Sequence, residues 1–297
     1  MSPWLLWLVF SLVEHLWLRI EFAGDIALGR SISHEIERMH ARAFFSSLRL
    51  HLKGTDIAFA NLEGSVRVGG TAPRASGYDL SFGEAVLPVL SWSGVTHFGL
   101  SNNHALDGGP GSRERTREAL GRLGVTGFHG IHRIACKGVE LAVVACDRTR
   151  SRGREALHTV RREAEKRLTF VFPHLGLEDT DLVTAEDRAF LRACLEAGAA
   201  GVFGHHPHRV KAGGPLLGRP GYPSLGSLVF DRSRSPDCFG LLVRVHVWAG
   251  TPVAWEEFIV HIRPGSHQPV VWPWRTSGGL APFPHRPTGF GTFLFLR

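Results

Sequence analysis

Residues that could bind a metal ion recur in five clusters along this sequence, each directly after a short apolar segment. Carboxylate oxygens and neutral imidazole nitrogens together suit Mn²⁺, Zn²⁺ or Fe²⁺ better than Mg²⁺ or Ca²⁺, which prefer oxygen ligands alone. The sequence therefore predicts a transition-metal site if the five clusters meet in space. The clusters are Gly24-Asp25, Asn61-Leu62-Glu63, Ser101-Asn102-Asn103-His104 with Asp107, Pro173-His174 with Glu178, and Gly204-His205-His206-Pro207-His208.

The number of candidate ligands points to more than one ion. About six or seven donors are too many for one four-coordinate ion, whereas two ions about 3.5–4 Å apart, sharing a bridging carboxylate, would use them. Such a pair lowers the pKa of bound water and clamps both the attacking and the leaving oxygen of a hydrolysis. We therefore expect two divalent ions, of Mn, Zn or Fe, and a hydrolytic reaction.

Each cluster taken alone has a simpler structural explanation. Asp25 could be a turn or cap residue, Asn102-Asn103 could form a turn, and His174 could be a solvated loop residue. The run from His205 to His208 is harder to explain this way, because three histidines in four residues favour metal binding. The metal interpretation rests on all five clusters occurring at the same kind of position.

The segments before and between the clusters predict the elements that position them. The apolar segments at 18–23, 57–60, 95–100, 139–146, 168–172 and 199–203 are short and rich in Val, Ile and Phe, as buried strands are. Helix-like stretches lie near 32–50, 83–92, 112–123, 154–167 and 185–197. This alternation predicts a layered α/β or α+β fold. Ligands of such folds bind outside the carboxyl ends of the strands, so a shared sheet would bring the clusters together.

The last third of the chain has a different pattern. Segments 227–230, 241–248 and 253–262 read as strands with little helix between them, and 243–247 alternates apolar and polar residues as a half-buried antiparallel strand does. From 264 onward the sequence is rich in Pro and Gly, and we expect an irregular tail.

Composition narrows the class of protein without naming a partner. The 297 residues are 43% hydrophobic and 21% charged, which excludes a wholly disordered or collagen-like chain. The formal net charge of +7 is compatible with an anionic partner. The four cysteines form no Cys-x-x-Cys motif and are expected to be reduced thiols, so metal ligands must come from carboxylates and from the 17 histidines.

The N-terminal residues 4–13 form an apolar run that Glu14 and His15 interrupt. A membrane-spanning helix needs roughly 20 apolar residues, and a signal peptide needs a basic start and a small-residue cleavage site, so neither is expected. A short packed or interfacial helix fits the run better, and a degraded or truncated membrane anchor is the alternative. Membrane association and a cytoplasmic location both remain open.

The ordered motifs resemble those of the CapA family, the poly-γ-glutamate capsule biosynthesis proteins, a branch of the calcineurin-like metallophosphoesterases. The resemblance covers about residues 18–262 and is most specific in Asn102-Asn103-His104-x-x-Asp107 and Gly204-His205-His206-Pro207-His208. It implies a four-layer α/β/β/α sandwich. We expect an N-terminal apolar segment at 1–17, a CapA-like domain at 18–263 and the irregular tail at 264–297.

The resemblance also implies roles for individual residues. His104 would be a general acid or a donor to a substrate oxygen, and Asp107 would orient it. Arg30, Asn61, Glu178 and His205 would bind substrate or support the metal ligands. The implied metal ligands are Asp25, Glu63, Asn103, His174, His206 and His208.

The function implied by the resemblance is a metal-dependent hydrolase in the synthesis, export or release of poly-γ-glutamate, acting on a phosphoester or a related anionic substrate. The alternative is a non-catalytic subunit that binds the polymer within a capsule-synthesis complex. One departure bears on the number of ions: the superfamily's first motif reads Asp-x-His, whereas this chain has Ala27 at the histidine position, a change that is typical of the CapA branch and counts against full occupancy by two ions. No stripe of aromatic and basic residues is visible, so nucleic acid is not an expected partner.

Overall fold

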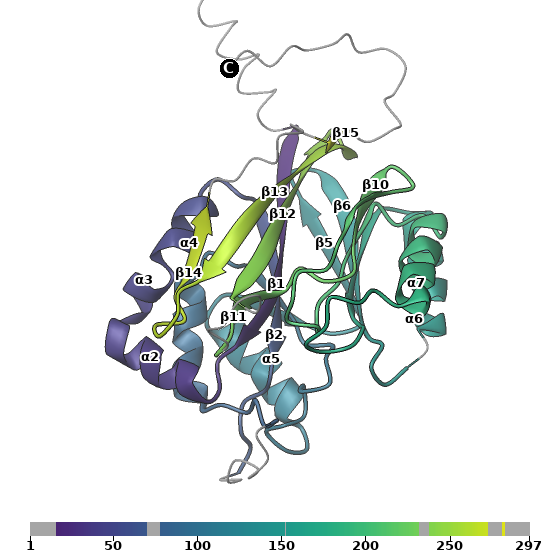
Figure 1. Ribbon diagram of the computed structural model, residues 1–297. Coiled ribbons are helices and arrows are strands. Elements are labelled where there is room, and N and C mark those ends of the chain that lie inside the picture. The colour runs from purple at the N-terminus through teal and green to yellow at the C-terminus, as the bar shows by residue number, and fades with distance from the viewer. Residues whose placement is uncertain (1–15, 70–77, 152, 232–237, 273–280, 283–297) are drawn as a thin grey trace, which may run out of the picture.

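Two β-sheets lie face to face, and each carries helices on its outer side (Figure 1). The computed structural model describes residues 16–69, 78–151, 153–231, 238–272 and 281–282. The apolar run predicted at 4–13 lies outside these residues, as do 273–280 and 283–297 of the predicted tail.

The first sheet has nine strands in the order β14-β13-β12-β1-β2-β3-β4, with β11 also paired to β1 and β15 to β13. Strands β1, β2, β3 and β4 run parallel, whereas β12, β13 and β14 join them in antiparallel fashion. The strands are β1 (Trp17–Ala27), β2 (Ile57–Glu63), β3 (His97–Gly99), β4 (Thr126–Phe128), β11 (Ser227–Val229), β12 (Phe239–Trp248), β13 (Thr251–Ile262), β14 (Pro269–Trp272) and β15 (Ala281–Pro282).

The second sheet has six strands in the order β5-β6-β7-β8-β10-β9. Its central strands β6, β7, β8 and β10 are parallel, and β5 and β9 are antiparallel edges. The strands are β5 (Ile131–Cys136), β6 (Val139–Asp147), β7 (Leu168–His174), β8 (Gly201–Phe203), β9 (Gly214–Leu216) and β10 (Arg219–Tyr222).

The helices form two outer layers. Those that pack on the first sheet are α2 (Ser31–Met39), α3 (Ala41–Phe44), α4 (Ser46–His51), the 3-10 helix η1 (Glu84–Trp92) and α5 (Ser112–Arg122). Helices α6 (Arg154–Ala164) and α7 (Ala185–Glu196) pack on the second sheet (Figure 1). Thr184 caps α7 by accepting a hydrogen bond from the backbone N–H of Asp187 (3.0 Å).

Apolar side chains fill the space between the sheets. The Phe22 ring of β1 stacks on Phe203 of β8 with ring centroids 3.9 Å apart, and on Phe59 of β2 at 5.1 Å. Phe170 and Phe172 of β7 complete this aromatic centre. Two further apolar clusters join each sheet to its own helices. The predicted four-layer α/β/β/α sandwich is therefore confirmed.

Three sequence-based expectations differ from the structure. The predicted helix over 32–50 is broken into α2, α3 and α4, because His40 has φ of 62°, outside the helical region. The region from 264 is not wholly irregular, since β14 and β15 both pair with β13. Several short or edge strands, including β5 and β9, were not predicted. Among the described residues, no helix is both long and apolar enough to cross a membrane.

Candidate metal centre

The predicted ligands meet where the carboxyl ends of the central parallel strands of both sheets come together. In the first sheet, β1 and β2 pair in parallel with Asp25 opposite Asn61 and Ala27 opposite Glu63. In the second sheet, His174 ends β7 and forms a parallel bridge with His205, which follows β8. The site is thus built at the junction of the two sheets, as the placement of the clusters predicts.

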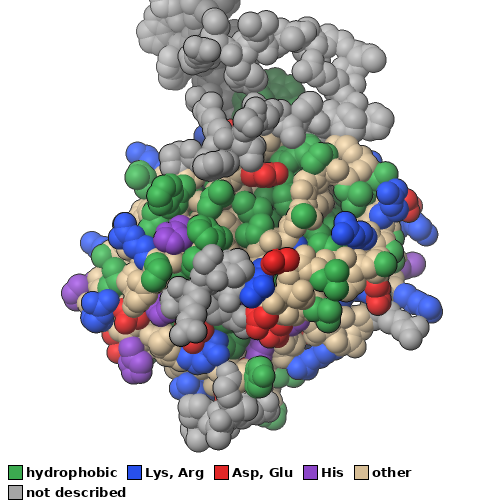
Figure 2. Space-filling view, viewed as in Figure 1, with side chains coloured by type: hydrophobic (Ala, Val, Ile, Leu, Met, Phe, Trp, Pro, Cys, Tyr) green, Lys and Arg blue, Asp and Glu red, His purple; other side chains and the backbone are tan. Residues whose placement is uncertain are grey.

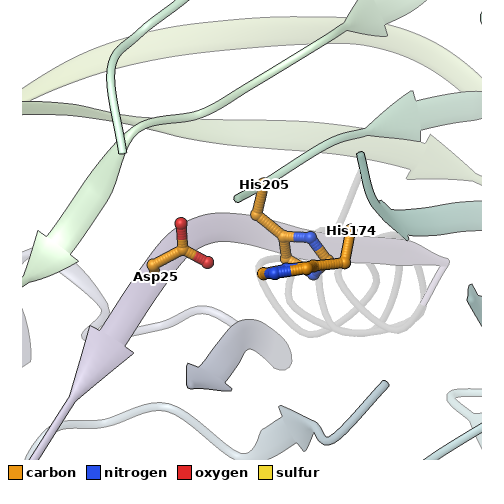
Figure 3. Close-up of side chains that lie close together, drawn as sticks. All are labelled: Asp25, His174 and His205. Atoms are coloured by element: carbon orange, nitrogen blue, oxygen red, sulfur yellow. The ribbon is translucent and has the colours of Figure 1, made fainter. Parts of the chain in front are cut away.

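Three overlapping groups of side chains have ligand atoms close enough to share a metal ion. Figure 3 shows the first group, in which the carboxylate of Asp25 faces the rings of His174 and His205. Within each group the candidate ligand atoms all lie within 4.8 Å of one another. The groups are Asp25–His174–His205, Glu63–His174–His206 and Asp25–Glu63–His208.

Asp25 is the residue about which the site is organised. Its Oδ1 accepts a hydrogen bond from Nδ2 of Asn61 (2.7 Å), and its Oδ2 accepts one from the backbone N–H of His206 (3.1 Å). Nδ1 of His208 lies 3.2 Å from Oδ2. Burial by itself raises the pKa of Asp25, but the contact with His208 and the nearby His205 and His174 lower the pKa overall. The carboxylate is therefore ionised and suited to a cation.

Three of the candidate ligands, His174, His205 and His206, are held in the neutral form that a metal requires. Burial, followed by the neighbouring histidines, places the pKa of His174 well below its ordinary value. Burial is also the main cause that lowers the pKa of His205 and of His206 from 6.5 to about 4, and Asp25 opposes it in both. Neutral imidazoles in a buried group with carboxylates are metal ligands by type.

The unused hydrogen-bonding capacity of these histidines supports the same interpretation. Nδ1 of His174, His205 and His206 is buried and has no hydrogen-bond partner among the described residues. Buried polar atoms are normally paired, so such a set in one place calls for a group that would satisfy them. A divalent cation fits the donor set of carboxylate, imidazole and amide oxygen. The backbone adds strain, because His206 and His208 have positive φ of 107° and 57°.

His104 and Asp107 lie at the edge of the ligand cluster. Nδ1 of His104 is 2.6 Å from Oδ2 of Asp107, and its Nε2 is 3.8 Å from Oε1 of Glu63. Oδ2 of Asp107 also accepts a hydrogen bond from the backbone N–H of Leu80 (2.9 Å). The His104 ring is thereby fixed with one nitrogen toward the carboxylate and the other toward the candidate metal ligands.

Asn103 and Asn102 have different positions although they are adjacent in sequence. Oδ1 of Asn103 is 2.7 Å from Nε2 of His174, so its amide reaches the ligand cluster. No individual role was predicted for Asn102. Its Nδ2 donates to Oδ1 of Asn61 (3.1 Å) and to the carbonyl of Leu62 (2.9 Å), and its Oδ1 accepts from the backbone N–H of His104 (3.2 Å). The only sequence feature that could have pointed to this role of Asn102 was its position next to Asn103.

The predicted supporting residues have different contacts. Oε1 of Glu178 is 3.8 Å from Nδ1 of His206, and Asn61 contacts Asp25 as described. Arg30 instead pairs with Asp231, with Nη2 2.6 Å from Oδ1. Ala27 is buried against Leu80 and Phe230 and offers no ligand. His205 belongs to a ligand group rather than only to its surroundings.

Three known proteins are similar to this chain in sequence or in fold. The capsule biosynthesis protein CapA of Bacillus anthracis is 22% identical over 285 residues, which cover 85% of this chain and 69% of that protein. The PGA biosynthesis protein CapA of Bacillus subtilis (strain 168) is 25% identical over 257 residues, which cover 77% of this chain and 68% of that protein. A solved structure of a hypothetical protein from Thermus thermophilus shares the fold, with a TM-score of 0.51 and 19% sequence identity. The match covers 86% of this chain and 99% of the Thermus chain.

The family assignment follows from a match to a family profile. The profile of the family described as bacterial capsule synthesis protein PGA_cap matches residues 19–153 and 134–232, which together span more than half of the chain. The matched range contains every one of the metal-ligand candidates. This chain therefore belongs to the bacterial capsule synthesis protein family PGA_cap.

Proposed function

We propose that this protein is a metal-dependent hydrolase that acts in the synthesis, export or release of poly-γ-glutamate capsule. The names of its relatives support the biological context, since one is a capsule biosynthesis protein and another a PGA biosynthesis protein. The proposed substrate is a phosphoester or a related anionic substrate, such as the polymer itself. Other capsule-synthesis subunits are proposed partners.

The observation that carries the proposal is the position of the His104–Asp107 pair beside the ligand cluster. Nε2 of His104 faces Glu63 at 3.8 Å, and Glu63 itself belongs to two of the three ligand groups. A side chain that can move a proton therefore lies next to the place where a cation would be held. Metal ligands alone would also fit a structural site, whereas this pair adds a group suited to acid–base chemistry.

Different residues of the chain would have different roles in such a reaction. Asp25, Glu63, Asn103, His174, His206 and His208, together with His205, would hold one or two divalent ions of Mn, Zn or Fe. A bound ion of this kind supplies a Lewis acid and lowers the pKa of a water molecule. His104 would donate a proton from Nε2 to the leaving oxygen. Asp107 would keep the ring in the orientation that makes this possible, by accepting from Nδ1.

The alternative function is a non-catalytic subunit that binds the polymer. The buried Ala27 supports this alternative, because a position that carries a ligand in the wider superfamily contributes none here. The net charge of +7 fits an anionic polymer under both proposals. The measurement that distinguishes the two proposals is whether the metal-loaded protein turns over a substrate.

The test is hydrolysis by untagged protein loaded with Mn²⁺ or Zn²⁺, using generic phosphomonoesters, phosphodiesters and poly-γ-glutamate. The hydrolase proposal predicts turnover that is lost in His104→Gln while metal content is retained. Exposed His158 lies on helix α6 and belongs to no ligand group, so it provides the control His158→Gln with unchanged turnover. Metal-loaded protein that retains the polymer but cleaves none of these substrates would replace the hydrolase by the accessory subunit.

A further inference from the structure

A cleft lies beside the candidate metal centre, and none of the candidate metal ligands lines it. It has a volume of about 630 Å³, within the range of small-molecule sites, and lies between the start of α2 and the chain from Asp79 to Val86. Its lining includes Arg30, Ser31, Glu37, Arg67, Asp79 and Ser81.

Two contacts make this cleft a neighbour of the metal centre. Leu80, between Asp79 and Ser81 of the cleft wall, donates its backbone N–H to Asp107 (2.9 Å). On the opposite wall, the guanidinium of Arg30 lies over the ring of Phe230 at 5.6 Å, and that ring is 4.2 Å from the ring of His208. The cleft is thus linked through Leu80 to Asp107, which orients the proposed general acid His104, and through Phe230 to the candidate metal ligand His208.

The basic side chains of the cleft are held in fixed positions. Nε and Nη2 of Arg67 donate to the hydroxyl and the carbonyl of Ser81 (3.1 and 3.0 Å). Within the described residues, Nη1 of Arg67 makes no hydrogen bond, so it can donate to a ligand. Arg30 is already engaged by Asp231. Arg67 is therefore the arginine positioned to receive a carboxylate.

The cleft also has acidic side chains, which argues against a ligand of purely negative charge. Glu37 is exposed on α2 and makes no ion pair with any described residue. Asp79 is buried and accepts a hydrogen bond from the backbone N–H of Ser81 (2.7 Å). Figure 2 shows the same mixture of basic, acidic and histidine side chains over the face formed by α2 and α3. A cleft with both signs of charge suits a ligand that itself carries both.

We propose that this cleft binds the amino-terminal residue of a γ-linked glutamyl chain. In such a chain every residue has a free α-carboxylate, but only the first also has a free α-ammonium group on the same carbon. Arg67 would bind the carboxylate and Glu37 the ammonium. The inference takes the γ-glutamyl class of substrate from the proposed function and adds the end of the chain that is recognised, together with the residues that recognise it.

The experiment compares two probes in binding to the full chain without turnover. The first is γ-linked triglutamate with a free amino terminus, and the second is the same trimer acetylated on its amino group. Titration calorimetry should show that the free-amino trimer binds at least about tenfold more tightly, as expected for a charged hydrogen bond. Glu37→Gln should abolish this preference, and Arg67→Gln should weaken both probes. Glu35→Gln on the same helix, whose carboxylate pairs with Arg38 at 2.7 Å, is the matched control and should keep the preference.

Equal binding of the two trimers by the wild-type protein would overturn the inference. A preference unchanged in Glu37→Gln would overturn it as well, and Glu37 is exposed, so this variant should fold. If the wild-type protein prefers the free-amino trimer but hydrolyses no substrate, the proposed hydrolase function is wrong and this inference stands. Hydrolysis without any preference for the free amino group would remove this inference alone.

Discussion

Nδ1 of His104 and Oδ2 of Asp107 lie 2.6 Å apart, three residues from each other in sequence. The opposite nitrogen of the His104 ring faces Glu63 and the candidate metal ligands. The pair is therefore arranged so that a carboxylate orients the histidine that would act on a substrate, as carboxylates do for metal-bound and catalytic histidines.

Asp107→Asn should lower hydrolytic turnover by about 10–100-fold with little change in metal content. The amide cannot stabilise the charged ring as the carboxylate does, although it can still accept the hydrogen bond from Leu80. Initial rates and elemental analysis of the same preparation measure the two effects. Asp181→Asn, at an aspartate that is 75% exposed, is the control. Unchanged turnover in Asp107→Asn would deny Asp107 its orienting role.

Asn102→Ala should destabilise the protein by about 1–3 kcal/mol, because the carbonyl of Leu62 and the amide of Asn61 lose a buried hydrogen bond. Chemical denaturation of the metal-free protein measures this change. The substitution should also reduce turnover, since Asn102 holds the backbone of His104. A variant with wild-type stability would show that water replaces the amide at no cost.

The stability of the metal-free protein should rise with pH between about 4 and 6.5. Burial, and then the charge of His132, lowers the pKa of His97 from 6.5 to about 4. In that pH range the unfolded chain binds the extra proton and the folded protein does not, so stability is complete above about pH 6.5 and is lost as the pH falls. His97→Gln should reduce the slope of this dependence by about one proton in denaturation experiments at several pH values, and the buried His174, His205 and His206 should keep the remainder. His158→Gln, at an exposed histidine, should leave it unchanged.

Phe22→Ala should cost about 3–5 kcal/mol, because it opens a cavity where the two sheets meet. Phe22 contacts Phe203 in the second sheet and Phe59 in its own, so no single neighbour can fill the space. Denaturant unfolding gives the free energy. Leu50→Ala, at a leucine that is 74% exposed, should change it by no more than about 0.5 kcal/mol. Similar losses in both variants would mean that the aromatic centre contributes little.

The ligand cluster could be predicted from the sequence because it depends on a local rule. Asp25, Glu63 and His174 each belong to the end of a buried parallel strand, and the ends of such strands meet by topology alone. This meeting of the strand ends does not depend on the order of the strands within each sheet. The role of His205 could not be fixed in this way, because three histidines in four residues leave open which of them are ligands; in the structure His205 joins a ligand group with Asp25 and His174.

Features that depend on long-range packing could not be predicted in this way. The break at His40 lies within a stretch whose apolar spacing continues, and only the contacts of α3 and α4 with other elements fix it. Strand β14 is four residues long, and it forms because β13 offers a free edge and Ser47 accepts the N–H of Val271 (3.0 Å). The ion pair of Arg30 with Asp231, 201 residues away, is a further contact of this kind.

The central claim is that the buried cluster around Asp25 binds a divalent metal ion. Elemental analysis of untagged wild-type protein, before and after incubation with Mn²⁺, Zn²⁺ or Fe²⁺ and removal of free ions, tests it most directly. The account predicts bound transition metal that is lost in Asp25→Asn, whose amide keeps the shape of the site but lacks the charge, and kept in Asp181→Asn. Folded wild-type protein that takes up none of these ions, or an unchanged metal content in Asp25→Asn, would contradict it.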